Sequence, residues 1–435
     1  MVTTPHRPLS HTRVPATGDQ DGRGGSSRAA TPEMLRRFWS RVEGSAASST
    51  SYFLILGCAL ALTVIGLVMV LSSSSVENIG TSAGSYDLFF KQGMFAVLGL
   101  GLMFGISRLR PQQLKALAWP ALGLAVLLLL LVFTPLGKEV GGNRNWIEVG
   151  GMTAQPSEAA KLALCVWAAA VLERKARLVR QLRHTVVPVI FPGGAIVIGL
   201  VLLGRDLGTA LVIMLILAVT LFLAGTRLTY FAIAGGVAAV GAVVLALASG
   251  NRSTRIQAWL GQNCDHYTDP CYQSDHGMFA LASGGWWGVG LGQSRQKWSY
   301  IPEAENDFIF TILGEELGLV GALLVLVLFA GLAIGMFRVA RRAESLFIRI
   351  CTGAIMAWLV GQAFVNIAMV TGLLPVIGIP LPFISYGGSA LTLVLLAVGV
   401  VLCFAREERR QVLARNARNA APGGETASSP AGATS

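Results

Sequence analysis

The sequence consists largely of long apolar runs, and these runs limit its possible folds more than any other feature. Each run is about 20 residues long, the length that an α-helix needs to cross roughly 30 Å of hydrocarbon. Hydrophobic residues make up 53% of the 435 residues and charged residues only 13%, so one soluble core would leave much apolar surface uncovered. Alternating ten-residue segments, the mark of a membrane β-barrel, are absent. The pattern predicts an all-α polytopic membrane protein.

Ten of these runs are candidate membrane helices. Two adjoining runs are separated only by the turn at Arg205-Asp206, and the fourth run is short and contains Glu158 and Lys161. The ten runs are residues 52–72, 88–106, 116–136, 157–172, 185–203, 207–225, 229–249, 308–336, 346–374 and 386–405. A long connection, residues 250–307, therefore separates the seventh run from the eighth.

Lys and Arg residues gather in alternate connections, which predicts how the chain is oriented. The basic connections include Arg108 to Lys115, Arg174 to Arg183, Arg227 and Arg338 to Arg349, and both tails are basic too. Both termini are therefore expected in the cytoplasm, with residues 137–156, 250–307 and 375–385 outside. The net charge of +11 is mainly this topology signal. No basic patch is interleaved with aromatic residues, so nucleic-acid binding is not expected.

Two polar tails flank the membrane domain, which we place at residues 52–406. Residues 1–51 and 407–435 are rich in small residues, Pro and Arg and have few apolar groups to bury. Segments of this composition do not form a packed core. We therefore predict that both are disordered cytoplasmic tails.

Cysteine usage separates the membrane runs from the long outer connection. Cys264 and Cys271 lie in that connection, and on an oxidising side they are expected to form a local disulfide. The alternative is metal ligation together with His266 and His276. Two Cys and two His at these spacings match no familiar zinc pattern.

Polar residues cluster where the outer connection 137–156 leads into the fourth run, in "GGNRNWIEVGGMTAQPSEAAK", residues 141–161. Ionisable residues at the ends of membrane helices indicate a pathway or a site. Glu158 and Lys161 are three residues apart, so they share a helix face and can pair. Two interpretations follow: a structural ion pair between helices, or, together with Arg144, a cationic pocket beside a carboxylate.

The long connection brings further charges to the eighth run. Arg255 and Lys297 are followed by Glu303, Glu305 and Asp307. Asp307 is the last polar residue before the run, at the level where lipid headgroups lie, so it is our candidate for proton transfer. The connection could instead be an ordered extracellular cap without chemistry.

Two more acids, Glu315 and Glu316, lie deeper in the eighth run. They are flanked by Gly314 and Gly318, whose G-x-x-x-G spacing allows close packing of helices. We interpret both acids as structural groups that bond to neighbouring helices.

A Pro- and Gly-rich segment, "GIPLPFISYGGSA", precedes the last run. Its prolines cannot sustain a helix, and irregular backbone at membrane depth must line a cavity or be buried in protein. We expect it to line a cavity. Candidate contacts with a ligand are Ser385, Gly387, Gly388 and Ser389, because glycines allow the backbone to approach closely.

Four motifs in order resemble the FtsW/RodA family, the SEDS proteins, over about residues 52–406. They are "GNRNWI…QPSEAAK", "GRDLGTA", "GLGQSRQKWSYIPEAENDFIFTILGEELG" and "GIPLPFISYGGSA". The sequences of these motifs are most similar to those of the cell-division branch, in its actinobacterial form. The elongation branch is the alternative. Arg144-Asn145 departs from the family, which often has two adjacent basic residues there, and Ala390 stands where Ser is common.

The resemblance implies a peptidoglycan glycosyltransferase that polymerises lipid II at the outer face of the cytoplasmic membrane, at the division septum. It implies a class B penicillin-binding protein as partner, alongside other division proteins. The essential acid of the family falls on Asp307. The departing pyrophosphate needs positive charge, for which the candidates are Arg144, Lys161, Arg255, Lys297 or a divalent cation (Mg or Mn). Glu158 and Glu303 are further candidate binding residues.

Two other classes of function fit some of these features. Intramembrane polar residues and broken helices also serve transport, so a lipid II flippase is one alternative. A non-catalytic scaffold of the division machinery, docked through its basic tails, is the other. The charged residues lie on one side of the membrane domain, whereas an alternating-access site is expected near the midplane.

Overall fold

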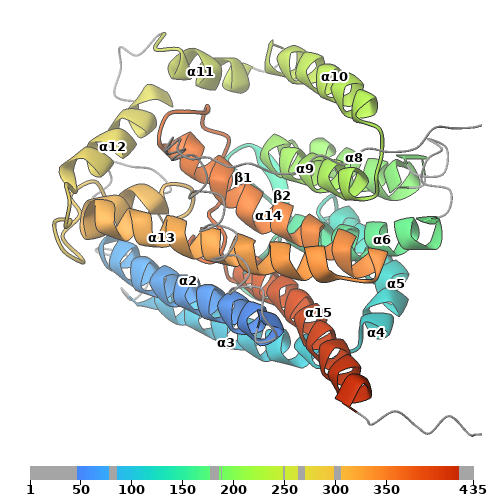
Figure 1. The fold of residues 1–435 in the computed structure, drawn as a ribbon. Coiled ribbons are helices and arrows are strands. Elements are labelled where there is room, and N and C mark those ends of the chain that lie inside the picture. The colour runs from blue at the N-terminus through green and yellow to red at the C-terminus, as the bar shows by residue number, and fades with distance from the viewer. Residues whose placement is uncertain are drawn as a thin grey trace, which may run out of the picture. The chain divides into compact units, whose positions relative to one another are not determined.

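The structure, a computed structural model, describes residues 47–77, 86–176, 186–187, 189–247, 250–262, 270–297 and 305–420. Each of the ten predicted apolar runs falls on a helix (Figure 1). These helices are α2 (Ala47–Glu77), α3 (Asp87–Ser107), α5 (Ala118–Leu131), α6 (Pro156–Arg174), α8 (Ala195–Leu203), α9 (Leu207–Leu223), α10 (Leu228–Leu247), α13 (Ile309–Arg342), α14 (Leu346–Val370) and α15 (Gly388–Ala420). Shorter elements are α4 (Pro111–Ala116), the π-helix η2 (Ile190–Gly194), α11 (Gly250–Trp259) and α12 (Pro270–Ser283).

Length and hydropathy support a membrane-spanning class for this fold. Within the described residues, five helical segments are long and apolar enough to cross a membrane: Thr50–Ser73, Asp87–Ser107, Ile309–Arg342, Leu346–Val370 and Gly388–Ala414. Three further apolar segments are shorter: Ala118–Leu131, Ile190–Leu203 and Leu207–Leu223. The helical membrane class is confirmed, and the crossing of the membrane by all ten helices stays a prediction.

A small antiparallel sheet adds to the predicted all-α fold. It has the order β1 (Gly137–Val140), β2 (Asn143–Val149) and β3 (Met152–Ala154). Gly141-Gly142 and Gly150-Gly151 join the strands as two-residue turns, and all four glycines have positive φ. Such turns match the twist of the paired strands and favour glycine at both positions. The two Gly-Gly pairs were a hairpin signal that the sequence analysis did not use.

The last helix extends further than predicted. Residues 407–435 were expected to be disordered, but α15 continues to Ala420, and α2 begins at Ala47, inside the predicted N-terminal tail. The sequence "REERRQVLARNARNA" contains mostly strong helix formers. Glu408 also pairs with Arg342 at the end of α13 (3.6 Å). Residues 1–46 and 421–435 lie outside the described part of the chain.

Contacts between helix ends gather several basic connections at one end of the helices, which we call the basic end. Lys115 of α4 forms an ion pair with Glu173 near the end of α6, and Ser345 in the α13–α14 turn donates to the same carboxylate (2.7 Å). Arg342 joins this turn to Glu408 of α15. Because α13 ends and α14 begins at the basic end, Asp307 and the segment after α14 lie at the opposite end (Figure 1).

The segment between α14 and α15, residues 371–387, is non-helical, as predicted. Ile379, Leu381 and Ile384 in it are almost fully buried. Side chains of α14 satisfy its carbonyls: Gln362 donates to Pro380 O (2.8 Å) and Asn366 to Ile379 O (2.7 Å). Much of this irregular backbone is therefore enclosed in protein, which is what its depth in a membrane requires.

Candidate functional site

The carboxylate of Asp307 lies against the irregular segment beside an arginine. A Cβ placed on Gly378 would be 3.3 Å from Asp307 Oδ2 and 4.0 Å from Arg255 Nη1. Arg255 also donates to Val376 O (3.4 Å). The fold thus brings together an acid before α13, a cation from α11 and a glycine with positive φ after α14. Asp307 is half-buried, so its carboxylate borders both protein and surroundings.

Three consecutive backbone carbonyls hold Asp307 in place. The carbonyls of residues 305, 306 and 307 accept, in that order, from Tyr386 N (2.9 Å), Ser385 Oγ (2.6 Å) and Asn366 Nδ2 (2.8 Å). The turn before α13 is therefore fastened to the irregular segment and to α14. Rigid support of this kind is what a catalytic group needs to keep a productive geometry.

Asn366 has the central position in this support. It is fully buried, and its Nδ2 donates both to Asp307 O and to Ile379 O, one residue after Gly378. One amide group therefore fixes the backbone that carries the acid relative to the backbone beside Arg255. No role for Asn366 was predicted from the sequence, because an Asn within an apolar run gives no sign of its partners.

The residues predicted to contact a ligand in 385–389 make internal contacts in the described structure. Ser385 accepts from Leu381 N (2.7 Å) while donating to the carbonyl of residue 306. Gly387 N donates to Gln92 (3.2 Å), and Ser389 Oγ accepts from Gln155 N (3.3 Å). Gly388 packs so closely against Phe95 that a Cβ would overlap the ring. Gly387 thus joins the irregular segment to α3, while Gly388 and Ser389 join the start of α15 to α3 and to the residue before α6.

Glu158 and Lys161 form a buried ion pair on α6, with an N–O distance of 2.7 Å and 2% side-chain exposure each. Lys161 Nζ also donates to Gln362 of α14 (2.9 Å) and lies 5.1 Å from the centre of the Trp358 ring. Of the two interpretations of this pair, the geometry agrees with the ion pair between helices. Burial and pairing leave the Lys161 ammonium enclosed by protein.

Arg144 lies elsewhere and does not form a common pocket with Lys161. Its Nε donates to Val132 O (3.0 Å) and its Nη2 to Thr134 O (2.9 Å). It lines a small cavity of ≈ 10 Å³ together with Ser157 and Asp206, among other residues. The predicted cationic pocket of Arg144 and Lys161 is therefore not present in the described structure, because each cation has partners in a different place.

Asp206 is a further polar centre, one for which the sequence analysis gave no role. It caps α9 by accepting from Thr209 N (2.9 Å), and it also accepts from Asn145 (2.8 Å) and Gln155 (3.2 Å). One buried carboxylate thereby joins β2, the start of α6 and the start of α9. The spacing in "GRDLGT" was a usable N-cap signal, since Asp before a helix commonly accepts from a backbone N–H two or three residues on.

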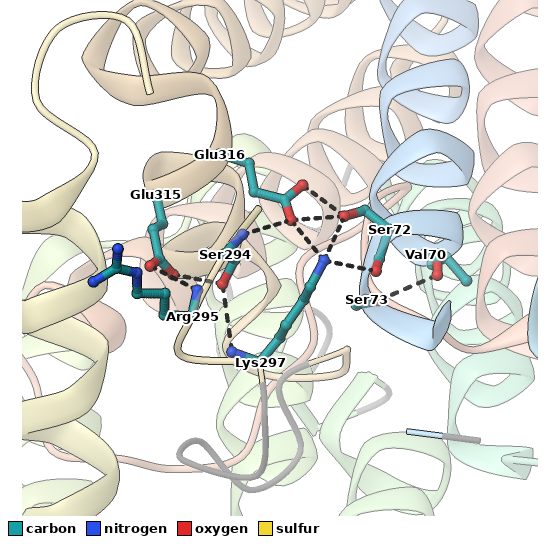
Figure 2. A network of polar contacts seen from close by, with 8 residues as sticks. All are labelled: Val70, Ser72, Ser73, Ser294, Arg295, Lys297, Glu315 and Glu316. Carbon is teal, nitrogen blue, oxygen red and sulfur yellow. Dashed lines mark hydrogen bonds and ion pairs between the residues drawn. The ribbon is translucent and has the colours of Figure 1, made fainter. Parts of the chain in front are cut away.

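Lys297, a predicted substrate cation, lies in a buried network at the far end of α2. Figure 2 shows its ammonium between Ser72 and Glu316, 3.1 Å from Glu316 Oε1 and 3.2 Å from Ser72 O. The side chains of Lys297 and Glu316 are 1% and 0% exposed. Ser72 Oγ donates to the same carboxylate at 2.7 Å. The charge of Lys297 is therefore compensated inside the protein.

The same network includes a break in α13 at Gly318, where φ is +69°. The carbonyls of Glu315 and Glu316 accept from Val289 N (2.9 Å) and Gly290 N (3.0 Å) instead of from the next helical turn. The Glu315 carboxylate accepts from Ser294 Oγ and Arg295 N (Figure 2). Glu315 and Glu316 thus fasten residues 289–297 to α13 and, through Ser72, to α2.

The structure describes only some of the remaining residues that were predicted from the sequence. Glu303 and Cys264 lie outside the described residues, while Cys271 is buried and disulfide-bonded. No group of three or more His, Cys, Asp or Glu residues within the described ranges is placed to hold a metal ion. Arg255 next to Asp307 further disfavours a cation there. A divalent cation at the pyrophosphate stays a prediction, because Mg²⁺ can be bound by one or two carboxylates together with substrate phosphates.

Comparison with known proteins identifies the family. A model for FtsW, RodA and SpoVE, described as "Cell cycle protein", matches residues 52–410. The chain belongs to this family.

Individual FtsW/RodA/SpoVE relatives resemble the chain over most of its length. The "Probable peptidoglycan glycosyltransferase FtsW" of Mycobacterium tuberculosis is 36% identical over 421 residues, covering 93% of this chain and 80% of that protein. The crystal structure of RodA from Thermus thermophilus is 28% identical with a TM-score of 0.60, covering 82% and 97%. A chain from a peptidoglycan synthase complex that coordinates polymerization and crosslinking is 29% identical with a TM-score of 0.64, covering 81% and 97%.

The buried Lys297–Glu316 pair yields a stability prediction for this family member. Lys297→Met or Glu316→Gln leaves one buried charge or acceptor without its partner. We expect the free energy of unfolding to fall by about 3–5 kcal/mol. Thermal unfolding of the purified protein in detergent measures it. The double variant should recover part of the loss, because both charges are then removed.

A matched control is the exposed pair Asp87–Lys91, with a similar distance of 2.7 Å. Exposed ion pairs contribute little, so Lys91→Met should leave the unfolding midpoint nearly unchanged. Equal small effects of Lys297→Met and Lys91→Met would contradict a structural role for the buried pair.

Proposed function

We propose that this protein is a peptidoglycan glycosyltransferase that polymerises lipid II at the outer face of the cytoplasmic membrane during septal cell-wall synthesis. Its family and the names of its relatives support the reaction, and the name of the mycobacterial relative favours the division branch over elongation. The observation that carries the assignment of the base is the place of Asp307, beside Arg255 and on firmly held backbone.

In this reaction a hydroxyl of one lipid-linked sugar attacks the anomeric carbon of another. The new C–O bond forms as the bond between that carbon and the pyrophosphate breaks, and the pyrophosphate leaves with the electron pair. Asp307 accepts the proton of the attacking hydroxyl. A positioned general base typically accelerates such a step by about 10² to 10⁴. Because the displacement inverts the anomeric carbon, one carboxylate is sufficient.

Arg255 is the best-placed of the predicted cations to bind the leaving pyrophosphate. Lys161 and Lys297 are in buried ion pairs, and Arg144 donates to backbone carbonyls. The guanidinium of Arg255, in contrast, shares with Asp307 the space in front of Gly378. Fixed positive charge where negative charge develops is a large source of transition-state stabilisation. The membrane orients the two substrates by holding their lipid tails.

The distribution of charge supports the proposed orientation. Basic residues such as Lys115, Arg342 and Arg410 lie at the basic end, and Lys and Arg near membrane helices favour the cytoplasmic side. Asp307 then lies at the outer side, where the lipid-linked sugars of wall synthesis are consumed. Both described ends of the chain, the start of α2 and the end of α15, are cytoplasmic in this arrangement.

The resemblance to a chain of a peptidoglycan synthase complex supports a crosslinking partner. We infer that the partner is a class B penicillin-binding protein, and that other division proteins join them at the septum. A flippase is the weaker alternative. The deeply buried charges of Lys161 and Lys297 are already paired with acids of the same chain, which leaves them poorly suited to carry a headgroup across.

Asp307→Asn keeps the shape of the side chain and removes its basicity, so polymerisation should fall by at least about 10²-fold. Lipid II polymerisation by the purified protein with its cognate partner measures this. Protein level and partner binding should be unchanged. The control is Glu305→Gln, two residues earlier, which should retain most activity. Near-normal polymer from Asp307→Asn would assign the base to another carboxylate.

Asn366→Ala should lower kcat by about 10- to 100-fold with a smaller change in KM, since a misplacement of about 1 Å can cost 10²-fold. Steady-state polymerisation kinetics separate the two constants. Gln362→Ala is the control, because Gln362 also donates to the irregular segment but makes no bond to residues 305–307. A change confined to KM, or equal kcat losses in both variants, would contradict a positioning role for Asn366.

Cysteine labelling tests the orientation. Glu139→Cys, on exposed β1, should react with a membrane-impermeant maleimide in intact cells, whereas Arg110→Cys, exposed at the basic end, should react only after permeabilisation. The four cysteines of the apolar runs are buried and give a low background. The reverse pattern would invert the topology and place Asp307 in the cytoplasm.

A further inference from the structure

A second cavity lies at the basic end, on the opposite side of the protein from Asp307. Its volume is ≈ 310 Å³, within the usual range for small-ligand sites. It lies between the start of α2, the end of α3 and the C-terminal part of α15. Its lining residues are Tyr52, Phe104, Ser107, Arg108, Arg406 and Arg409. No role in the proposed reaction accounts for it.

The lining carries three guanidinium groups and no carboxylate. The acids next along α15 are engaged elsewhere: Glu407 pairs with Arg410 (3.9 Å) and Glu408 with Arg342 (3.6 Å). Among the described residues, none of the three lining arginines forms an ion pair. Arg406 and Arg409 are three positions apart on one helix, a spacing at which like charges repel. The cavity therefore has a positive potential that an anion would relieve.

A simpler account of these arginines is their position alone. Basic residues collect at the cytoplasmic ends of membrane helices, and Arg108 directly follows α3, where a cation complements the negative end of the helix dipole. This account covers the presence of Arg108, Arg406 and Arg409, but not that all three line one cavity that contains no carboxylate. Three arginines that line one cavity indicate that it binds an anionic ligand.

The other walls indicate what that ligand carries. Tyr52 and Phe104 are aromatic, and Phe104 is 40% exposed on α3, a helix long and apolar enough to cross a membrane. A site lined by arginines together with aromatic side chains, one of them exposed on an apolar helix, suits a phosphate with an attached apolar chain. Basic pockets between membrane helices at the cytoplasmic side are suited to lipid headgroups. Arginine forms paired hydrogen bonds with phosphate oxygens.

We propose that this cavity binds the phosphate group of an anionic phospholipid, held by Arg108, Arg406 and Arg409. The bound headgroup joins the start of α2, the end of α3 and α15. Inorganic phosphate carries similar negatively charged oxygens, so the experiment must distinguish binding of a phospholipid from binding of free phosphate. The site is distinct from the proposed lipid II site, which lies at the opposite end of the helices.

The test uses the full-length protein purified in a neutral detergent. Phosphatidylglycerol, phosphatidylcholine and inorganic phosphate are titrated separately, and the thermal unfolding midpoint and retention of lipid in native mass spectrometry are recorded. Phosphatidylglycerol should raise the midpoint and be retained, while the other two should do neither. Arg406→Gln/Arg409→Gln should weaken the response to phosphatidylglycerol by at least about tenfold, because two charge-assisted contacts are lost.

The matched control is Arg410→Gln, which removes a neighbouring exposed charge that does not line the cavity. It should respond like the unmodified protein. If the double variant folds poorly, the exposed Arg409→Gln alone carries the test. Equal responses to phosphatidylglycerol and phosphatidylcholine, or an unaltered response in the variants, would overturn the proposal. If inorganic phosphate stabilised the protein and displaced the bound lipid, the proposal that the phosphate belongs to a phospholipid would be wrong.

Discussion

Backbone that leaves the helix inside a membrane protein must find a partner for each polar group, because lipid supplies none. Residues 371–387 are under this constraint, and side chains of α14 meet part of it. The donor that satisfies the segment also holds the acid: Asn366 bonds to Ile379 O and to Asp307 O at once. The geometry of the proposed site is therefore a consequence of how the irregular backbone is satisfied.

The break at Gly318 is a second case of the same constraint. Carbonyls freed from the helix accept from residues 289 and 290, and the neighbouring acids accept from Ser294, Arg295 and Lys297. Lys297, which precedes the acids 303–307 in the sequence, and Glu316, which follows them, are thus both fixed. Removal of one charge from this network is expected to lower the stability of the fold, whereas removal of the Asp307 charge is expected to lower activity.

Periodicity and length were enough to predict the helices, because hydrocarbon thickness sets the length of every apolar run. They were not enough to assign the cations. The spacing of Glu158 and Lys161 predicted that they could pair, but it left a ligand pocket open, because the second partner of Lys161, Gln362, lies 201 positions away. Glu316 compensates the charge of Lys297 from 19 positions away, and Ser72 bonds to Lys297 from 225 positions away, which no local spacing shows. The two Gly-Gly hairpins, in contrast, were visible in the sequence, and the all-α expectation missed them because it rested on the apolar runs alone.

The position of Asp307 was predictable for a physical reason. A carboxylate just before an apolar run has to lie near the headgroups, and this needs no knowledge of its neighbours. The three acids lie within ten residues, and the sequence distinguished Asp307 from Glu315 and Glu316 only by their greater depth in the apolar run. The fold adds their partners. The two deeper acids accept several hydrogen bonds from residues 294–297, and Lys297 compensates Glu316. Asp307 instead combines a fixed backbone with a half-buried carboxylate and a nearby guanidinium, which supports our proposal that it accepts the proton of the attacking sugar hydroxyl.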